Sequence, residues 1–491
     1  MNPYPKRLME VDLPIKKISE HARREKSIRH GHISTLHIWW ARRPLAACRA
    51  VICAALWPDP GDPNCPERFK TEAARLMKAF RDKRGGMPRN WDDGVALRQA
   101  LLDFIADFAN WDNSTVKDYL ETSRALTQVA HESLGGEPGT RPLVVDPFAG
   151  GGSIPLEALR VGADAFASDL NPIPILLNKI IIEYIPKYGD TLINQIRESA
   201  FRITTELKKT LDHFYHIENK KEEIPYAYIW ARTITCEGPI CGYRFPLLRS
   251  LWLSQKSKNK VALALKTNTE EKLIEVDIID NVSSEKLGNG TSKQGAATCP
   301  VCGYTTPVER VRVQLSSREG GTIDAQLLVV AVTSSSSVGK KYRLPSKDEI
   351  ISFNRSREHY IMLKTNDRNP IPLIPNEELN HLRGFFNVVL YGMKKWGDLF
   401  NPRQALLMAN LVKLIQNEYE CLIISENNLA EAVTTCLALM AGKVAQYNSS
   451  CCRWKATGET LVDMFGRQAI PMVWDFTEAY PFNGTTGDYS Q

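Results

Sequence analysis

The chain has 491 residues, a length that suits two to four domains. Hydrophobic residues make up 43% of it and charged residues 24%, which is typical of a globular protein. No apolar run approaches the roughly 18 residues of a membrane span, and the N-terminus lacks the apolar core of a secretory signal. We therefore expect a cytoplasmic protein with no membrane partner, whose 11 cysteines are reduced thiols or metal ligands.

The net charge of +6 is concentrated in the first 50 residues, which hold eleven basic and four acidic side chains. Within this segment Trp39 and Trp40 lie beside Arg42 and Arg43. Aromatic side chains interleaved with arginines can stack on bases or other rings and pair with phosphate or carboxylate, which favours an anionic partner. The alternative is a solvated helix face with the tryptophans in a core, and charge alone does not separate the two.

Helices are expected over residues 45–57 and 66–135, after the basic segment. Pro44 fits the first turn of a helix over 45–57, and the spacing of apolar residues predicts further helices between 66 and 135. Apart from its basic end, this region carries no pattern that indicates chemistry.

The strongest pattern lies at 141–172. A short apolar strand over 143–145 ends in Asp146, a turn with three consecutive glycines follows, a helix covers 154–161, and a second strand over 165–167 precedes Asp169. Glycines in such a turn let the backbone approach a ligand, and an acid after the second strand can accept hydrogen bonds from ribose hydroxyls. Three adjacent glycines disfavour the dehydrogenase fingerprint, and the lack of a following Gly-Lys-Ser/Thr excludes a Walker A loop.

A β-rich segment over 226–345 contains two short cysteine motifs. Each has two cysteines followed by Gly-Tyr: Cys236 and Cys241, then Cys299 and Cys302. Four thiolates on two tight turns form a closed tetrahedral site, which indicates structural Zn²⁺ rather than a catalytic metal. The wide separation of the two pairs leaves open the alternative of four unrelated buried thiols. Alternating apolar residues at 273–279 and 311–315 predict strands in this segment.

The remaining segments predict more helices and few strands. Residues 172–213 suggest two helices split around 187–190, and Asn401-Pro402 fits the start of another helix. A short strand is expected over 420–425, a helix over 428–446, and loop-like chain over 447–491. We expect four parts: a basic and helical region at 1–135, the first part of a cofactor-binding α/β core at 136–225, an inserted β-rich zinc-ribbon module at 226–345, and the continuation of the core at 346–491.

The run from Asp146 to Gly152 resembles the S-adenosylmethionine loop of amino-group DNA methyltransferases, whose pattern is Asp-x-Phe-x-Gly-x-Gly. Together with the segments at 24–32, 34–46, 396–404 and 474–478 and the paired cysteine motifs, it is similar to the zinc-ribbon-containing adenine-specific DNA methylases of prokaryotic restriction and anti-phage islands. The resemblance implies a Rossmann-like α/β methyltransferase core, double-stranded DNA as a partner, and S-adenosyl-L-methionine and structural Zn²⁺ as cofactors. The residues implied in cofactor binding are Asp146, Pro147, Phe148, Ala149, Gly150, Gly152, Asp169 and Asn171.

The chain departs from that family in one respect. The family carries Asp/Asn/Ser-Pro-Pro-aromatic, which accepts hydrogen bonds from the target amine and stacks on the flipped base. No Pro-Pro dipeptide occurs in the 491 residues. The sequence therefore indicates no catalytic residue in this chain, an incomplete core, and a partner polypeptide that brings this motif to a DNA adenine-N6 methyltransferase. Two alternatives stay open: an inactive truncated remnant, and a non-catalytic zinc-containing DNA-binding or scaffold protein.

Overall fold

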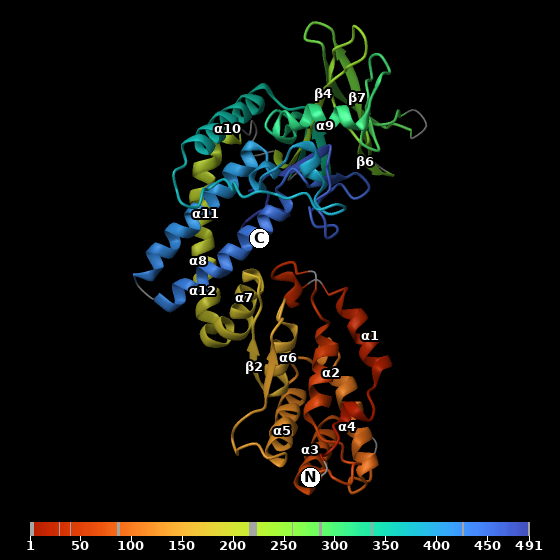
Figure 1. Ribbon diagram of the computed structural model, residues 1–491, viewed down its shortest axis with the longest axis vertical. Coiled ribbons are helices and arrows are strands. Elements are labelled where there is room, and N and C mark those ends of the chain that lie inside the picture. Colours follow the sequence, from red (N-terminus) through yellow and green to blue (C-terminus); the bar gives the residue numbers. More distant parts are fainter. Residues whose placement is uncertain are drawn as a thin grey trace. The chain divides into compact units, whose positions relative to one another are not determined.

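The computed structural model describes residues 4–28, 30–39, 41–85, 89–215, 223–257, 259–283, 287–334, 337–424 and 427–489 (Figure 1). Trp40, one of the expected aromatic residues of the basic segment, lies outside these ranges. The chain divides into two compact units, Met1–Leu192 (unit 1) and Ile193–Gln491 (unit 2), and both mix helices with strands. None of the helices in the described ranges is long and apolar enough to cross a membrane.

Unit 1 begins with a helical layer, in which α2 to α5 agree with the predicted helices and α1 was not predicted. The central helix, α2, buries residues all round because it packs against α1, α4, α5 and α6. Apolar side chains of these helices form one core that extends to Ala158 and Val161 of α6. The helices of this layer are α1 (Ile15–Glu25), α2 (Leu45–Leu56), α3 (Glu67–Arg84), α4 (Gly94–Phe108) and α5 (Lys117–Ser133), with short 3-10 turns at Leu8–Glu10, Ile33–Thr35 and Trp111–Asn113.

A strand–helix–strand element follows the helices: β1 (Leu143–Asp146), α6 (Ser153–Val161) and β2 (Asp164–Ala167). The two strands pair in parallel, with Val144 opposite Ala165 and Val145 opposite Phe166. Val144 and Ala165 pack on the helical core, whereas the other face of the strands is exposed. This confirms the predicted order of strand, glycine turn, helix and strand.

Three helical segments lead out of unit 1. They are α7 (Pro172–Asn178), a π-helical turn at Lys179–Tyr184, and α8 (Ile185–Leu211). Gly189 has φ 50° and ψ −128°, which breaks the helix at the expected position between 187 and 190. Pro172 occupies the first turn of α7, and Asn171 caps it by accepting a hydrogen bond from the Ile173 N–H.

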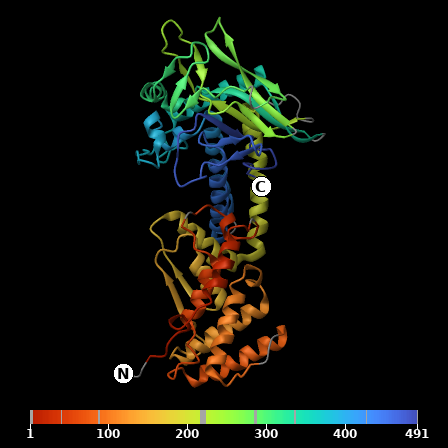
Figure 2. The same ribbon diagram turned by 90° about the vertical axis from the view of Figure 1, so that its right-hand side faces the viewer.

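Unit 2 contains two antiparallel-rich sheets at one end of its long helices (Figure 2). One sheet has the order β13-β12-β3-β16, and the other has the order β4-β5-β8-β7-β6. Two small sheets, β11-β10-β9 and β14-β15, complete it. The strands are β3 (Glu223–Ala231), β4 (Thr233–Thr235), β5 (Arg244–Pro246), β6 (Trp252–Lys256), β7 (Asn259–Asn268), β8 (Leu273–Asp280), β9 (Ser292–Lys293), β10 (Ala296–Thr298), β11 (Thr305–Thr306), β12 (Gln326–Ser334), β13 (Ser337–Arg343), β14 (Arg453–Lys455), β15 (Thr460–Val462) and β16 (Asp475–Ala479).

Three predictions for unit 2 are wrong. Residues 311–315 lie in a helix, α9 (Val308–Ser316), because Val311 and Leu315 share its buried face while Val313 is exposed. Residues 420–423 are the last turn of α11 rather than a strand. The expected loop at 447–491 contains β16, an edge strand that pairs with β3. That pairing joins the segment expected to continue the core to the one expected as an insert.

The long helices of unit 2 are α10 (Lys347–Asn366), α11 (Pro402–Ile423) and α12 (Asn427–Tyr447). Asn401 begins α11 with a capping box to Gln404, as the Asn-Pro pair predicts, and α12 agrees with the expected helix at 428–446. Arg403 and Glu478 form a fully buried ion pair that links α11 to β16.

Candidate functional site

The glycine turn of unit 1 is closely packed. Gly150 and Gly152 have φ values of 49° and 77°, which residues with a Cβ rarely adopt. The Ala149 N–H donates to the Ser168 carbonyl, and the Asp146 carboxylate accepts from the Phe148 N–H. The turn therefore joins the carboxyl ends of β1 and β2, where ligands bind in open α/β sheets.

Asp169 connects the end of β2 to the glycine turn. Its carboxylate accepts hydrogen bonds from the Asn171 N–H and the Gly150 N–H, each at 2.9 Å. These bonds, Asn171 first, lower the pKa of the Asp169 carboxyl, so the group is ionised at neutral pH. A carboxylate has about four acceptor positions, so two remain for ligand hydroxyls.

Side chains from the N-terminal segment and α7 lie directly on the glycines. A Cβ at Gly150 would lie 2.7 Å from Trp39 Nε1, and one at Gly151 would lie 3.0 Å from Arg42 Nε. A Cβ at Gly152 would lie 3.0 Å from the Asn178 side-chain oxygen. Each glycine is therefore needed, because a Cβ would collide with one of these side chains. The polar side chains around the turn come from other parts of the chain, so the sequence of the turn does not reveal them.

Four buried polar atoms around the turn have no hydrogen-bond partner among the described residues: Trp39 Nε1, Arg42 Nη1, Ser153 Oγ and Asn178 Oδ1. Buried polar atoms are usually satisfied, so a cluster of unpaired ones indicates a polar ligand. Burial lowers the pKa of Arg42 to about 10, which still leaves a cation at neutral pH. A guanidinium beside the N-terminus of α6 suits a carboxylate, and S-adenosylmethionine carries one at its methionine end.

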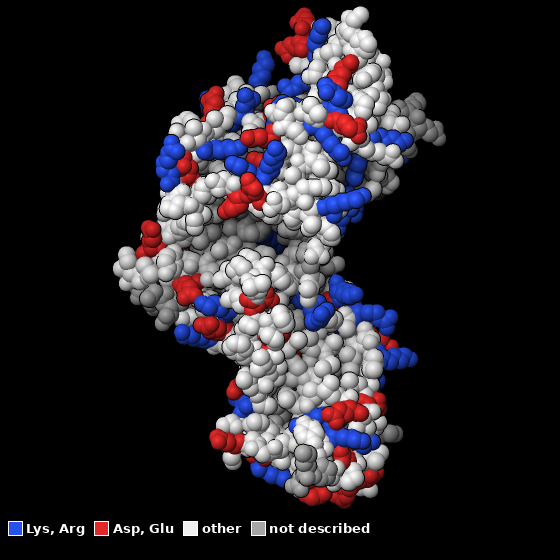
Figure 3. All heavy atoms as spheres, in the orientation of Figure 1, with Lys and Arg blue, Asp and Glu red and all other residues white. Residues whose placement is uncertain are grey.

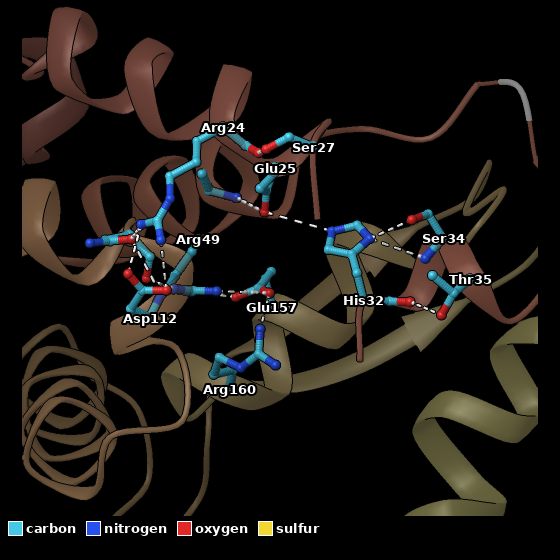
Figure 4. Close-up of polar contacts among 12 residues, drawn as sticks. Arg24, Glu25, Ser27, His32, Ser34, Thr35, Arg49, Asp112, Glu157 and Arg160 are labelled. Atoms are coloured by element: carbon cyan, nitrogen blue, oxygen red, sulfur yellow. Dashed lines mark hydrogen bonds and ion pairs between the residues drawn. The ribbon is translucent and has the colours of Figure 1, made fainter. Parts of the chain in front are cut away.

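A buried network holds the N-terminal segment against α6 (Figure 4). Arg49 Nε lies 2.6 Å from Glu157 of α6, and Arg160 contacts the same carboxylate. Glu25 accepts from the Ala46 N–H at 3.1 Å, and His32 Nε2 lies 3.9 Å from Glu25. Because Trp39 and Arg42 lie between these anchors, the network fixes their position beside the glycine turn.

Some of the predicted site residues meet at the glycine turn, and others do not. It brings Asp146, Ala149, Gly150, Gly152 and Asp169 together around the turn through the contacts described above. Phe148 is 84% exposed, Pro147 is exposed, and the side-chain oxygen of Asn171 caps α7. The sequence predicted an anionic partner for Trp39 and Arg42 but did not connect them with the glycine turn. It gave no signal for Ser153 and Asn178, which carry no local motif.

A second site lies in unit 2, where all four predicted thiols meet. The sulfur atoms of Cys236, Cys241, Cys299 and Cys302 lie within 4.8 Å of one another, with 3.5 Å from Cys236 to Cys302 and 3.8 Å from Cys241 to Cys299. A zinc tetrahedron with bonds of about 2.3 Å has sulfur–sulfur edges of about 3.8 Å, so the four residues fit Zn²⁺. The Gly238 N–H donates to Cys236 Sγ at 3.3 Å.

Basic side chains gather on the exposed surface of α1. Figure 3 shows Lys and Arg spheres over the part of unit 1 where Figure 1 labels this helix. Lys16, Lys17, Arg23 and Lys26 are exposed and form no ion pair with a described residue, and Arg43 is exposed as well. Arg42, in contrast, is half-buried on Gly151, so the two adjacent arginines have different environments.

Comparisons with known proteins agree with the position of the first site. Residues 12–80 match a family described as a protein of unknown function (DUF1156). Neither a curated protein nor a solved structure matches the chain. Residues 136–278 match the D12 class N6 adenine-specific DNA methyltransferases, which supports S-adenosylmethionine as the cofactor. This match contains β1, the glycine turn and β2, and it supports a DNA methyltransferase function for the chain.

Proposed function

We propose that this chain is the S-adenosylmethionine-binding part of a DNA adenine-N6 methyltransferase of a restriction or anti-phage type system. The observation that carries the proposal is the set of unpaired polar atoms around the glycine turn, inside the segment similar to the D12 class. In this proposal β1, α6 and β2 begin a Rossmann-like core, and Zn²⁺ on the four cysteines stabilises a ribbon in unit 2.

Each residue around the turn has a distinct part in holding the cofactor. Arg42 pairs with the methionine carboxylate, and the unpaired Trp39 N–H and Asn178 oxygen bind polar atoms next to it. Asp169 accepts from the ribose hydroxyls with the two acceptor positions that its backbone contacts leave free. The Gly150 to Gly152 backbone allows this approach because no Cβ stands in the way.

The bound cofactor supplies an electrophilic methyl group on a sulfonium. This chain orients that group, and the exposed cations of α1 hold the phosphates of double-stranded DNA. This methyl group would pass to the target amine, which would lose a proton, and the sulfonium would become a neutral thioether. The residues that accept hydrogen bonds from the amine come, in our proposal, from a partner polypeptide with the Pro-Pro-aromatic motif.

The exposed side of β1 and β2 supports the need for a further polypeptide. Leu143, Val145 and Phe166 are 61%, 57% and 56% exposed on one face of the pair. Parallel strands occur almost only where both faces are covered, and a two-stranded sheet is marginal in water. We propose that the partner covers this face.

Calorimetric titration of S-adenosylmethionine into the purified chain tests the cofactor site. We expect binding by the wild type and binding about 10- to 100-fold weaker for Arg42→Gln, because a charge-assisted hydrogen bond is lost. Arg43→Gln is the matched control, since the neighbouring arginine is exposed, and it should bind as the wild type does.

Two results would contradict the proposal. If the wild type does not bind the cofactor, alone or with a co-encoded partner, the remnant or scaffold alternative holds instead. If Arg42→Gln and Arg43→Gln bind equally well, Arg42 does not hold the carboxylate. Transfer of a labelled methyl group to DNA only in the presence of the partner would support the shared active site.

A further inference from the structure

Unit 2 contains a small pocket between β6, β14 and the start of β16. Its volume is about 240 Å³. The floor is apolar and consists of Ile229, Leu248, Leu253, Leu263 and Trp454. Two hydrogen bonds hold its walls together: Trp454 Nε1 donates to the Leu253 carbonyl, and the Gln255 N–H donates to the Ala456 carbonyl. The pocket is therefore built on ordered strands.

The rim of this pocket is basic. Arg249, Arg453 and Lys455 line it, all three are exposed, and none forms an ion pair with a described residue. By contrast, Lys256 on the neighbouring strand lies 2.5 Å from Glu459. The charge of Arg249 also attracts the Asp475 carboxylate in the same pocket, which leaves Arg453 and Lys455 without an acidic partner among the described residues. Cations gathered at the mouth of one pocket favour an anionic group there, such as a phosphate.

One acidic side chain lies inside the pocket. Asp475 is half-buried, and its Oδ1 accepts from the Arg249 N–H at 3.1 Å. Burial raises the pKa of Asp475 to about 6, so the group is mainly ionised at neutral pH. Its other oxygen forms no hydrogen bond with a described residue and can accept from a ligand N–H.

The aromatic side chain of Trp252 completes the lining. It is half-buried at the start of β6 and forms no ring contact with another described aromatic residue. An indole face available in a pocket is a stacking surface for a nucleobase. The volume is below the roughly 300–1,000 Å³ of pockets for drug-sized ligands, which suits a single base with its phosphate outside.

We propose that this pocket binds one nucleotide, with an amino group of the base on Asp475, the ring on Trp252 and the phosphate on Arg249, Arg453 and Lys455. This assignment concerns unit 2 only and does not depend on the cofactor site of unit 1. The nucleotide is either free or part of a single strand, because both present the same base and phosphate. Thymine is the poorest fit, since two carbonyl oxygens flank its one N–H and would face the carboxylate.

Fluorescence titration of the full chain at pH 7.5 tests the proposal. The probes are dAMP, dCMP, dGMP and dTMP, and single-stranded oligonucleotides of one base each. We expect quenching of tryptophan emission and at least about tenfold weaker binding of dTMP than of the tightest of the other three. Asp475→Asn should reduce this preference, and Arg453→Gln with Lys455→Gln should weaken all four nucleotides about tenfold or more.

Lys413→Gln, an exposed lysine on α11 outside the pocket, is the control and should leave binding unchanged. If oligonucleotides bind and mononucleotides do not, with the same response to the variants, the site takes a nucleotide within a strand. No binding of either probe, equal affinity for dTMP, or no response to the pocket variants would overturn the proposal. S-adenosylmethionine binding, measured on the same samples, reports separately on unit 1.

Discussion

At the scale of single residues, Arg403 and Glu478 form a fully buried ion pair in unit 2. Both side chains are 0% exposed, Arg403 Nε lies 2.9 Å from Glu478 Oε1, and Nη2 donates to Oε2 at 3.0 Å. Glu478 also accepts from Tyr215 Oη and Trp230 Nε1, so each of its oxygens has partners. Buried ions of this kind are stable only when both are present.

Removing one of the two charged side chains should therefore lower the free energy of unfolding. We expect Glu478→Gln to lower the free energy of unfolding by about 3–5 kcal/mol, because Arg403 keeps its charge in an environment without water. Urea denaturation followed by tryptophan fluorescence measures this change.

Two further variants distinguish the effect of the ion pair from a general loss of stability. Asp277→Asn removes an exposed pair with Lys266 and should cost only a small fraction of that loss. The double variant Arg403→Met with Glu478→Gln should be less destabilised than the two single losses added together. Additive losses would mean that the two residues do not depend on each other.

Two adjacent arginines, Arg42 and Arg43, have different environments in the structure. Arg42 and Arg43 look equivalent in the sequence, yet one packs on Gly151 and the other is exposed. The sequence predicts an anionic partner for both, because arginine binds phosphate and carboxylate alike. Only the position of the glycine turn, more than a hundred residues later, separates their environments.

At the scale of elements, two helices of unit 2 begin with a capping box, and the one at Asn401 was predicted from the Asn-Pro pair. Asn401 accepts from the Gln404 N–H at the start of α11, and Ser346 accepts from the Glu349 N–H at the start of α10. Asn401 differs in one respect, since its Nδ2 also donates to Glu478 at 3.0 Å. Its side chain thus caps a helix and satisfies the buried carboxylate as well.

We expect Asn401→Ala to cost more than an ordinary cap. Loss of a capping side chain costs about 1 kcal/mol, and loss of a hydrogen bond to a charged group adds about 1.5–3 kcal/mol. Ser346→Ala, the matched control on α10, should cost only about 1 kcal/mol. Equal losses in thermal or urea unfolding would show that the bond to Glu478 contributes nothing.

The wrong predictions also belong to this scale. Val311 and Leu315 alternate with polar residues as in a strand, but they are four residues apart and share one helix face as well. Residues 421–424 form a short apolar run, a pattern that fits a strand or the end of a buried helix. Asp475–Ala479 becomes a strand because β3 offers it a free edge, which no local signal reveals.

At the scale of the whole molecule, the division into two units leads to a prediction about zinc. Cys236, Cys241 and Cys299 pack in a core cluster of unit 2 with Val311 and Leu315 of α9, and Cys302 is exposed beside them. The core of unit 1 contains none of the four. Replacing Cys236 and Cys299 by serine should remove about one equivalent of zinc and lower the melting temperature of unit 2, because structural zinc supplies folding energy. Metal analysis and differential scanning calorimetry measure both effects.

The loss should be confined to unit 2. S-adenosylmethionine binding, which we assign to unit 1, should persist in the zinc-free variant. Cys421→Ser, an exposed cysteine on α11 outside the cluster, is the control and should keep its zinc. Unchanged zinc in the double variant would reject the metal site.

The sequence by itself determined the local features of this protein. It indicated the order strand, glycine turn, helix and strand, the starts of α2 and α11, and the four cysteines that meet in space, because these depend on neighbouring residues or on a repeated motif. Tertiary structure alone decided which distant side chains surround the glycine turn, which apolar runs are helices, and that β16 completes a sheet with β3. Those outcomes depend on which surfaces remain free after the rest of the chain has packed, and that is not encoded in any short segment.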